Sequence, residues 1–264
     1  VLATKENFSS RRHYLNMRNC IATLLENRVI PIVNENDTIS VTELMFTDND
    51  ELSGLIASMV DSEALIILSN IDGVFTAHPN SENAKLIERI EPAENDFEDA
   101  ISSEHSNFGR GGMLTKFRIA RKVAADGIGV HIANGTRENV LLDVMADKKT
   151  IPHTYFVPNN RHSSSVKKWI AYSDGFAKGK VIINEGAEKA LLSSKAVSLL
   201  PVGISRVENE FKKGDLVKIM NDKHEIIAIG KAAYASENIE NEKQPEKQKP
   251  LIHYDYLYLE KNIV

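Results

Sequence analysis

The sequence predicts an α/β protein, with an open and mostly parallel sheet sandwiched by helices, followed by a small and mainly β barrel-like domain. Helical patterns alternate with fully apolar strand patterns over residues 1–152, which is typical of a parallel sheet covered on both faces. Short β-rich runs separated by Gly, Asp and Asn dominate residues 176–264. The composition is that of a globular protein, with 42% hydrophobic and 26% charged residues.

The elements of the first domain follow from the spacing of its apolar residues. Side chains that recur every three to four residues predict helices, and short runs that are apolar throughout predict buried strands. The helices are expected over residues 11–28, 51–62 and 113–127, and the strands over residues 29–33, 64–69 and 129–133. Gly127 is expected to end the third helix, because glycine commonly follows the last helical residue.

The second domain is predicted from a change of pattern after residue 152. Residues 153–175 are expected to form a linker and the first element, and residues 176–264 the domain itself. Its strands are expected over residues 180–184, 203–207, 216–220, 226–234 and 254–259, and one helix over residues 186–194. The charged segment 236–250 is poor in apolar residues and predicts a solvated loop.

Composition also excludes several classes of protein. No apolar run approaches the length of a membrane span, so no membrane partner is expected. Cys20 is the one cysteine, which rules out an internal disulfide and favours a reducing compartment; its apolar helical surroundings predict a buried thiol. Residues 165–264 hold 16 Lys and Arg against 14 Asp and Glu, a net charge too weak for a nucleic-acid footprint. The histidines show no metal-ligand spacing, so no metal site is predicted.

Polar side chains follow each predicted strand of the first domain. Residues 34–38 follow the first strand, Ser69 and Asn70 the second, and Asn134 the third. Ligands of α/β proteins bind outside the carboxyl ends of the strands. These side chains are therefore expected at one edge of the sheet, together with the cluster 48–50 that opens the helix between the first two strands.

A glycine-rich stretch, FGRGGMLTK at residues 108–116, precedes the third helix. Glycines let backbone N–H groups approach a ligand closely, and a helix N-terminus attracts an anion. Thr115 and Lys116 add a hydroxyl and a cation. The spacing fits neither the P-loop nor the dinucleotide fingerprint. Beside the acidic and amide-rich edge, the stretch indicates a phosphate site next to a site for an amine-bearing substrate.

Four stretches together resemble the glutamate 5-kinases of the amino acid kinase family: PIVNENDTIS, FTDNDELSGLIASMV, LSNIDGVFTAHP and GRGGMLTKFRIARKVAADGI. Three later stretches resemble a PUA domain: KGKVIINEGAEKALL, SLLPVGISRVENEFKKGDLVKI and IHYDYLYL. The resemblance implies ATP-dependent phosphorylation, with Mg²⁺, of the side-chain carboxylate of L-glutamate to glutamyl 5-phosphate, the first step of proline biosynthesis. It also implies proline as a feedback inhibitor, a homo-oligomer and a cytoplasmic location.

The resemblance implies roles for individual residues as well. The catalytic residues would be Asp50, Lys116 and Asp48, with Asp50 holding lysines in position. Glutamate would be bound by Asp37, Asn49 and Asn34. The nucleotide would contact Ser69, Asn70, Gly111, Gly112, Met113, Leu114, Thr115 and Lys116. The family usually has Asp at the position of Asn70 and Thr at that of Arg110, so this chain departs from the pattern at two places near the nucleotide.

The family's N-terminal segment, a strand with a Lys-Gly-Ser phosphate-binding loop, has no counterpart in this sequence. Val1 matches a position well inside the kinase domain, so we expect the chain to be the C-terminal part of a longer protein and inactive alone. Two other hypotheses are an amino acid kinase acting on uridylate or aspartate, and an RNA-binding protein that uses its PUA-like domain. The NEND motif argues against the former, and the weak net charge without an aromatic stacking platform against the latter.

Overall fold

A computed structural model describes residues 1–36, 49–77, 79–92, 112–146, 151–159, 164–193, 195–242 and 249–260. These residues divide between two compact units. The first unit holds Val1–Asn7 and Leu15–Ser163, and the second holds Phe8–Tyr14 and Ser164–Asn262. No helix in the described ranges is long and apolar enough to cross a membrane.

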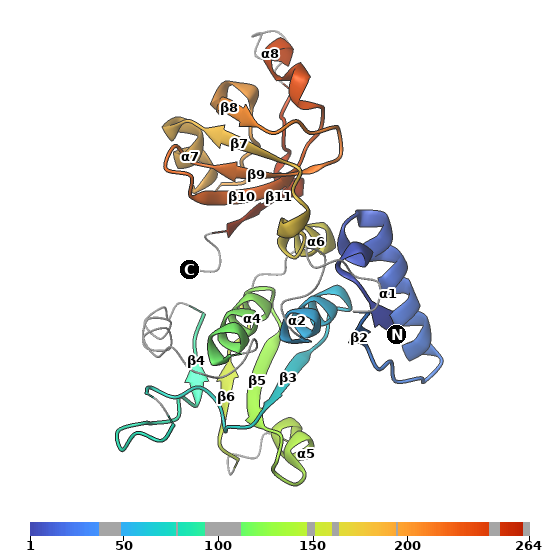
Figure 1. Cartoon of the computed structure of the whole chain (residues 1–264), viewed down its shortest axis with the longest axis vertical. Coiled ribbons are helices and arrows are strands. Elements are labelled where there is room, and N and C mark those ends of the chain that lie inside the picture. Colours follow the sequence, from blue (N-terminus) through green and yellow to red (C-terminus); the bar gives the residue numbers. More distant parts are fainter. Residues whose placement is uncertain are drawn as a thin grey trace. The chain divides into compact units, whose positions relative to one another are not determined.

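The first unit follows the expected alternation of helices and strands (Figure 1). Its helices are η1 (Lys5–Phe8), α1 (Arg11–Glu26), α2 (Asn49–Met59), α4 (Met113–Ala125) and α5 (Val140–Met145), of which η1 and α1 each give some residues to the second unit. Its strands are β1 (Leu2–Ala3), β2 (Asn34–Glu35), β3 (Ala64–Ser69), β4 (Arg89–Ile90), β5 (Gly129–Asn134) and β6 (His153–Phe156).

A four-stranded sheet in the order β3-β5-β6-β4 forms the centre of this unit. β3 and β5 run parallel with Ala64 opposite Gly129, and β4 runs parallel to β6. β6 is antiparallel to β5, with Val130 opposite Phe156. A mostly parallel sheet with helices is therefore confirmed for this unit, with one antiparallel pair inside it. A separate two-residue ladder joins β1 to β2.

Helices cover both faces of the central sheet. On one face α4 contributes Phe117, whose ring meets that of Phe156 edge-on at a centroid distance of 5.5 Å. Ala133 packs with Val140 and Val144 of α5. Phe156 lies opposite Val130, and side chains alternate between faces along a strand, so Ala133 points away from the α4 side. The α5 helix therefore lies against the other face of the sheet.

Three expectations for the first unit are wrong. Residues 29–33 form no strand, and Ile30 and Ile32 are 86% and 83% exposed. The ladder with β1 covers Asn34 and Glu35, and among residues 29–33 the carbonyl oxygen of Ile32 accepts a hydrogen bond of 2.7 Å from the N-terminal ammonium of Val1. Cys20 is exposed, because the buried stripe of α1 is formed by Tyr14, Met17 and Ile21. Residues 153–156 are not a linker but strand β6 of the first unit's sheet.

The second unit is built around a five-stranded sheet in the order β11-β10-β9-β7-β8. The strands are β7 (Gly179–Ile183), β8 (Ile204–Glu208), β9 (Leu216–Met220), β10 (Ile226–Lys231) and β11 (Leu257–Leu259). The helices are α6 (Ser165–Ala171), η3 (Asp174–Phe176), α7 (Glu185–Leu191), η4 (Pro201–Gly203), η5 (Ser236–Asn238), α8 (Ile239–Glu242) and η7 (Tyr254–Tyr256). All neighbouring strands are antiparallel except β7 and β9.

The five expected strands and the helix of this unit are confirmed within a few residues. Its core is mainly aliphatic and includes Val181, Ile183, Val217, Ile219 and Leu251. The expectation of a loop at 236–250 is wrong for its first part, since η5 and α8 occupy 236–242. Burial of one apolar side chain, that of Ile239, explains why this charged segment is helical there.

The second unit also includes a segment from near the start of the chain. Trp169 Nε1 and Ser173 Oγ donate hydrogen bonds to the carbonyl oxygen of Phe8, at 3.0 and 3.1 Å. The guanidinium of Arg11 donates to the carbonyl and hydroxyl oxygens of Ser165. Residues 8–14 are therefore part of the second unit's structure although they precede most of the first unit in sequence.

Candidate active site

Two helices of the first unit begin at the same edge of its sheet. α2 leads into β3 and α4 leads into β5, so each helix starts near the carboxyl end of the strand that follows it. The helices pack closely, because a Cβ atom added to Gly54 of α2 would lie only 2.7 Å from Ile119 Cγ2 of α4. Near the opposite ends, the Ser58 hydroxyl donates a buried hydrogen bond of 2.7 Å to Asp126 Oδ2. The two helix N-termini are thus held side by side.

An ion pair connects these two N-termini. Lys116 Nζ of α4 donates a hydrogen bond of 2.6 Å to Asp50 Oδ2 of α2. Both side chains are largely enclosed, at 16% and 15% exposure. Lysine is disfavoured near a helix N-terminus, where the backbone dipole is positive. The structure therefore places a carboxylate beside a cation whose position near a helix N-terminus costs helix stability.

The start of α4 offers backbone donors beside Lys116. Its N-cap is Gly112, in an extended conformation and with no side-chain cap. Met113, Leu114 and Thr115 form the first turn, which contains no acidic residue. A helix N-terminus without a capping side chain leaves N–H groups that can bind an anion, and a cation four residues after the N-cap adds to the attraction.

The residues expected to bind the substrate are only partly described. Asn49 is the first residue of α2 and is exposed, next to Asp50. Asn34 lies in β2, which contacts α2. The side chain of Lys5 reaches Glu51 in the first turn of α2, at 3.5 Å. Asp37, Asp48, Arg110 and Gly111 lie outside the described residues.

The loop after β3 carries the other two nucleotide candidates. The carbonyl oxygen of Ser69 accepts a hydrogen bond of 2.8 Å from the N–H of Gly135, which follows β5. The Ser69 hydroxyl donates a long hydrogen bond of 3.4 Å to Asn70 Oδ1. Asn70 is exposed. The carboxyl ends of β3 and β5 therefore present their polar residues together, as the strand order predicted.

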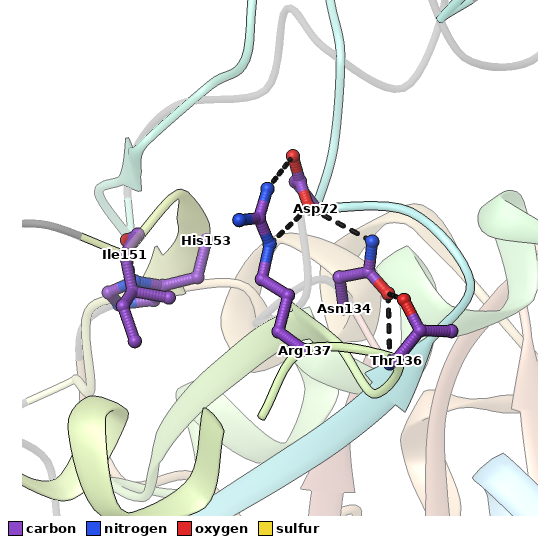
Figure 2. Close-up of polar contacts among 6 residues, drawn as sticks. All are labelled: Asp72, Asn134, Thr136, Arg137, Ile151 and His153. Carbon is purple, nitrogen blue, oxygen red and sulfur yellow. Dashed lines mark hydrogen bonds and ion pairs between the residues drawn. The ribbon is translucent and has the colours of Figure 1, made fainter. Parts of the chain in front are cut away.

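Sequence reasoning missed a second ion pair at this edge. Arg137 donates two hydrogen bonds to Asp72, from Nε to Oδ1 at 2.9 Å and from Nη2 to Oδ2 at 2.8 Å. Asn134 Nδ2 donates to the same Oδ1 at 3.1 Å, and its own Oδ1 accepts from the N–H and hydroxyl of Thr136. Figure 2 shows Asp72 between the side chains of Arg137 and Asn134.

This pair changes the acid–base properties of its members. The hydrogen bond from Arg137 is the main cause that lowers the pKa of Asp72, and burial opposes it. The same bond raises the pKa of Arg137. The signal available in the sequence was an acid three residues after one strand and a base three residues after its neighbour. Only the parallel register of β3 and β5 brings them together.

Metal ligands do not cluster in the described residues. Within the described ranges, no group of three His, Cys, Asp or Glu side chains could hold a metal ion. Mg²⁺ in nucleotide sites is held mainly by phosphate oxygens and water, with one or two carboxylates.

Comparisons with known proteins identify the family of this chain. A model of the amino acid kinase family matches residues 1–134, and a model of the PUA domain matches residues 179–249. A glutamate 5-kinase of Bacteroides thetaiotaomicron is 56% identical over 98% of this chain and 72% of its own length. A glutamate 5-kinase of Chlorobaculum tepidum is 48% identical over 98% of this chain and 71% of its own length.

These matches extend across both units, and the identity is far above the level at which only the fold is shared. The first unit contains the ion pair at two helix N-termini, and the second is the small, mainly β module. The chain therefore belongs to the glutamate 5-kinases of the amino acid kinase family and carries a PUA domain.

Proposed function

We propose that the protein containing this chain phosphorylates the side-chain carboxylate of L-glutamate with ATP, giving glutamyl 5-phosphate for the first step of proline biosynthesis. Two kinds of support converge. The relatives with high identity are glutamate 5-kinases. The observation that carries the proposal in the structure is the enclosed pair of Lys116 and Asp50 at two adjoining helix N-termini.

The chemistry needs charge stabilisation rather than proton removal. The side-chain carboxylate of glutamate is ionised at neutral pH, so it attacks without a general base. When bound, MgATP supplies the γ-phosphoryl group, whose bond to the ADP oxygen breaks as the bond to the carboxylate oxygen forms. The obstacle is the approach of two anions, which positioned cations and N–H dipoles relieve.

In this proposal Lys116 is the cation that faces the transferred group, and the N–H groups at the start of α4 assist it. Asp50 keeps the ammonium of Lys116 in place before substrate arrives, because a flexible lysine would lose much of its effect to reorganisation. Asp50 does not remove a proton. Asp48 is assigned to the catalytic residues from the family motif alone.

Substrate and nucleotide occupy opposite sides of this pair in the proposal. Asn49 and Asn34 bind glutamate beside α2, and Asp37 meets its ammonium group by motif alone. Ser69 and Asn70 bind the nucleotide from the end of β3. The segment Gly111–Lys116 binds its phosphates, and the uncapped N-terminus of α4 supports that role. Mg²⁺ enters with the phosphates.

Three further properties belong to the same proposal. Proline inhibits the enzyme by feedback, the protein acts as a homo-oligomer, and it works in the cytoplasm. The first two rest on the family resemblance. The third is supported by the single cysteine of the sequence, which favours a reducing compartment.

The test is an acceptor comparison with the natural protein that contains these 264 residues. ADP release is measured with ATP, Mg²⁺ and L-glutamate, L-aspartate or UMP at equal concentrations. We expect turnover with glutamate at least tenfold above that with the other two, as a site that hydrogen-bonds its substrate discriminates strongly. Equal or greater turnover with aspartate or UMP would assign the chain to another amino acid kinase activity.

A further inference from the structure

We propose that Asp72, Asn134 and Arg137 form a clamp that positions the nucleotide-binding loop Ser69–Asn70. None of the three belongs to the residues assigned above. The clamp is formed by the last residue of β5, Asn134, and by Asp72 and Arg137 in the loops after β3 and β5, so it joins the two loops that leave the carboxyl edge of the sheet. The proposal rests on the function proposed above for Ser69 and Asn70.

The loop after β3 is anchored at both ends by its backbone. At its start, the carbonyl oxygen of Ser69 accepts from the N–H of Gly135 at 2.8 Å. At its end, the N–H of Val74 donates to the buried hydroxyl of Thr154 at 2.8 Å. Between them Gly73 lies so close to β6 that an added Cβ would be 2.4 Å from Thr154 Oγ1. The loop therefore has little freedom at either end.

The clamp fixes the middle of the same loop. Both carboxylate oxygens of Asp72 accept hydrogen bonds, from Arg137 and Asn134. A bidentate arginine–carboxylate pair fixes direction as well as distance. Asn134 is itself held, because its amide oxygen accepts from the N–H and hydroxyl of Thr136 (Figure 2). Each member thus restrains the next, from β5 to the loop after β3.

The consequence falls on the two residues at the start of the loop. Asn70 is exposed and Ser69 is partly exposed, so both can meet a ligand. A loop that is already ordered loses less conformational freedom when it binds, which raises affinity without new contacts. Because the clamp touches no reacting atom in this proposal, loosening it should weaken nucleotide binding and leave the chemical step unchanged.

The experiment compares Asp72→Asn, Arg137→Gln and the double variant in the natural protein containing this sequence. Asp72→Asn keeps the shape of the side chain but removes its charge. Steady-state kinetics give kcat and the KM values for ATP and glutamate, and calorimetric titration gives the affinity for MgADP independently of turnover. The matched control is Asp61→Asn, which breaks an exposed pair with Arg18 and precedes β3 instead of following it.

We expect each single variant to raise the KM for ATP and the Kd for MgADP about fivefold, within a range of roughly twofold to tenfold for a partly exposed ion pair. The double variant should bind ATP and MgADP no more weakly than the weaker-binding of the two single variants, because both substitutions break the same ion pair. The KM for glutamate and kcat should stay within about twofold, and Asp61→Asn should change nothing.

Three results would overturn the clamp. Unchanged nucleotide affinity in Asp72→Asn would show that the clamp does not position the nucleotide-binding loop. A loss confined to Arg137→Gln would mean that Arg137 touches the nucleotide itself, and additive losses would mean that the two residues act separately. Failure of the wild-type protein to phosphorylate glutamate would contradict the proposed function but not the clamp, because the MgADP titration measures nucleotide binding independently of turnover.

Discussion

The replacement Lys116→Ala tests the central feature of the candidate site. Lys116 Nζ lies 2.6 Å from Asp50 Oδ2, and both side chains are about five-sixths enclosed. If the ammonium stabilises charge that develops during phosphoryl transfer, its removal deletes one preorganised donor. The expected loss in kcat is about 10²- to 10³-fold, with little change in the KM for glutamate.

The same replacement has a cost in stability that must be separated from the loss of activity. Breaking an exposed pair costs about 0–1 kcal/mol and breaking a fully buried one about 3–5 kcal/mol. With 15% and 16% exposure, Lys116→Ala should cost about 1–3 kcal/mol of the free energy of unfolding. A typical domain has about 5–15 kcal/mol, so the variant should remain folded in the assay.

The assay measures ADP release by the natural protein containing this chain, with saturating ATP, Mg²⁺ and glutamate. Circular dichroism and denaturant unfolding show that the variant is folded. Lys122→Ala is the matched control, since it removes a lysine from the last turn of the same helix. A folded Lys116→Ala enzyme with kcat within about tenfold of the wild type would refute the reasoning, since a preorganised donor contributes more.

Three further predictions concern packing and charge around the site. Ser58→Ala removes the donor to the buried Asp126 carboxylate and should lower the free energy of unfolding by about 1–3 kcal/mol in urea titration. Gly54→Val forces a side chain against Ile119 and should cost about 1–3 kcal/mol while also lowering kcat, because α2 and α4 must move apart. The hydrogen bond that lowers the pKa of Asp72 from 3.8 stabilises the fold above that pH, so wild type and Asp72→Asn should converge in stability as the pH falls below about 3.8.

Each of these has a result that would contradict it. Equal urea midpoints for wild type and Ser58→Ala would show that another donor satisfies the carboxylate. An unchanged kcat in Gly54→Val would show that the close packing of α2 against α4 does not affect catalysis. A group whose pKa is lowered by folding loses its stabilising contribution as it protonates. A difference in the free energy of unfolding between wild type and Asp72→Asn that persists or grows at low pH would therefore contradict the lowered pKa of Asp72.

The elements of the site that could be predicted from the sequence are those with strong local signals. The helices at 51–62 and 113–127 and the strands at 64–69 and 129–133 were placed within three residues of the ends of α2, α4, β3 and β5. Gly127 ends α4 as expected, with a positive φ of 89° that glycine adopts without strain. Lys116 could be singled out as the cation of the glycine-rich stretch that begins α4, whereas the role of Asp50 came from the family resemblance.

Elements that depend on a partner could not be predicted in the same way. β6, HTYF, has residues that favour strands but is only four residues long, and β5 and β4 pair with it on both sides. Residues 29–33 are more apolar than β6 and yet form no strand, and the nearest ladder, with β1, covers Asn34 and Glu35. Strand identity here follows long-range hydrogen bonding more than composition.

The sequence by itself determined the fold class, the two-part organisation and the family, because apolar periodicity and contiguous motifs are local properties that survive without coordinates. The tertiary structure alone decided which charges meet. Asp50 pairs with Lys116 across 66 positions of sequence, and Asp72 with Arg137 across 65. A side chain finds its partner through the register of β3 against β5 and the close approach of α2 to α4, and neither is encoded in the spacing of residues along the chain.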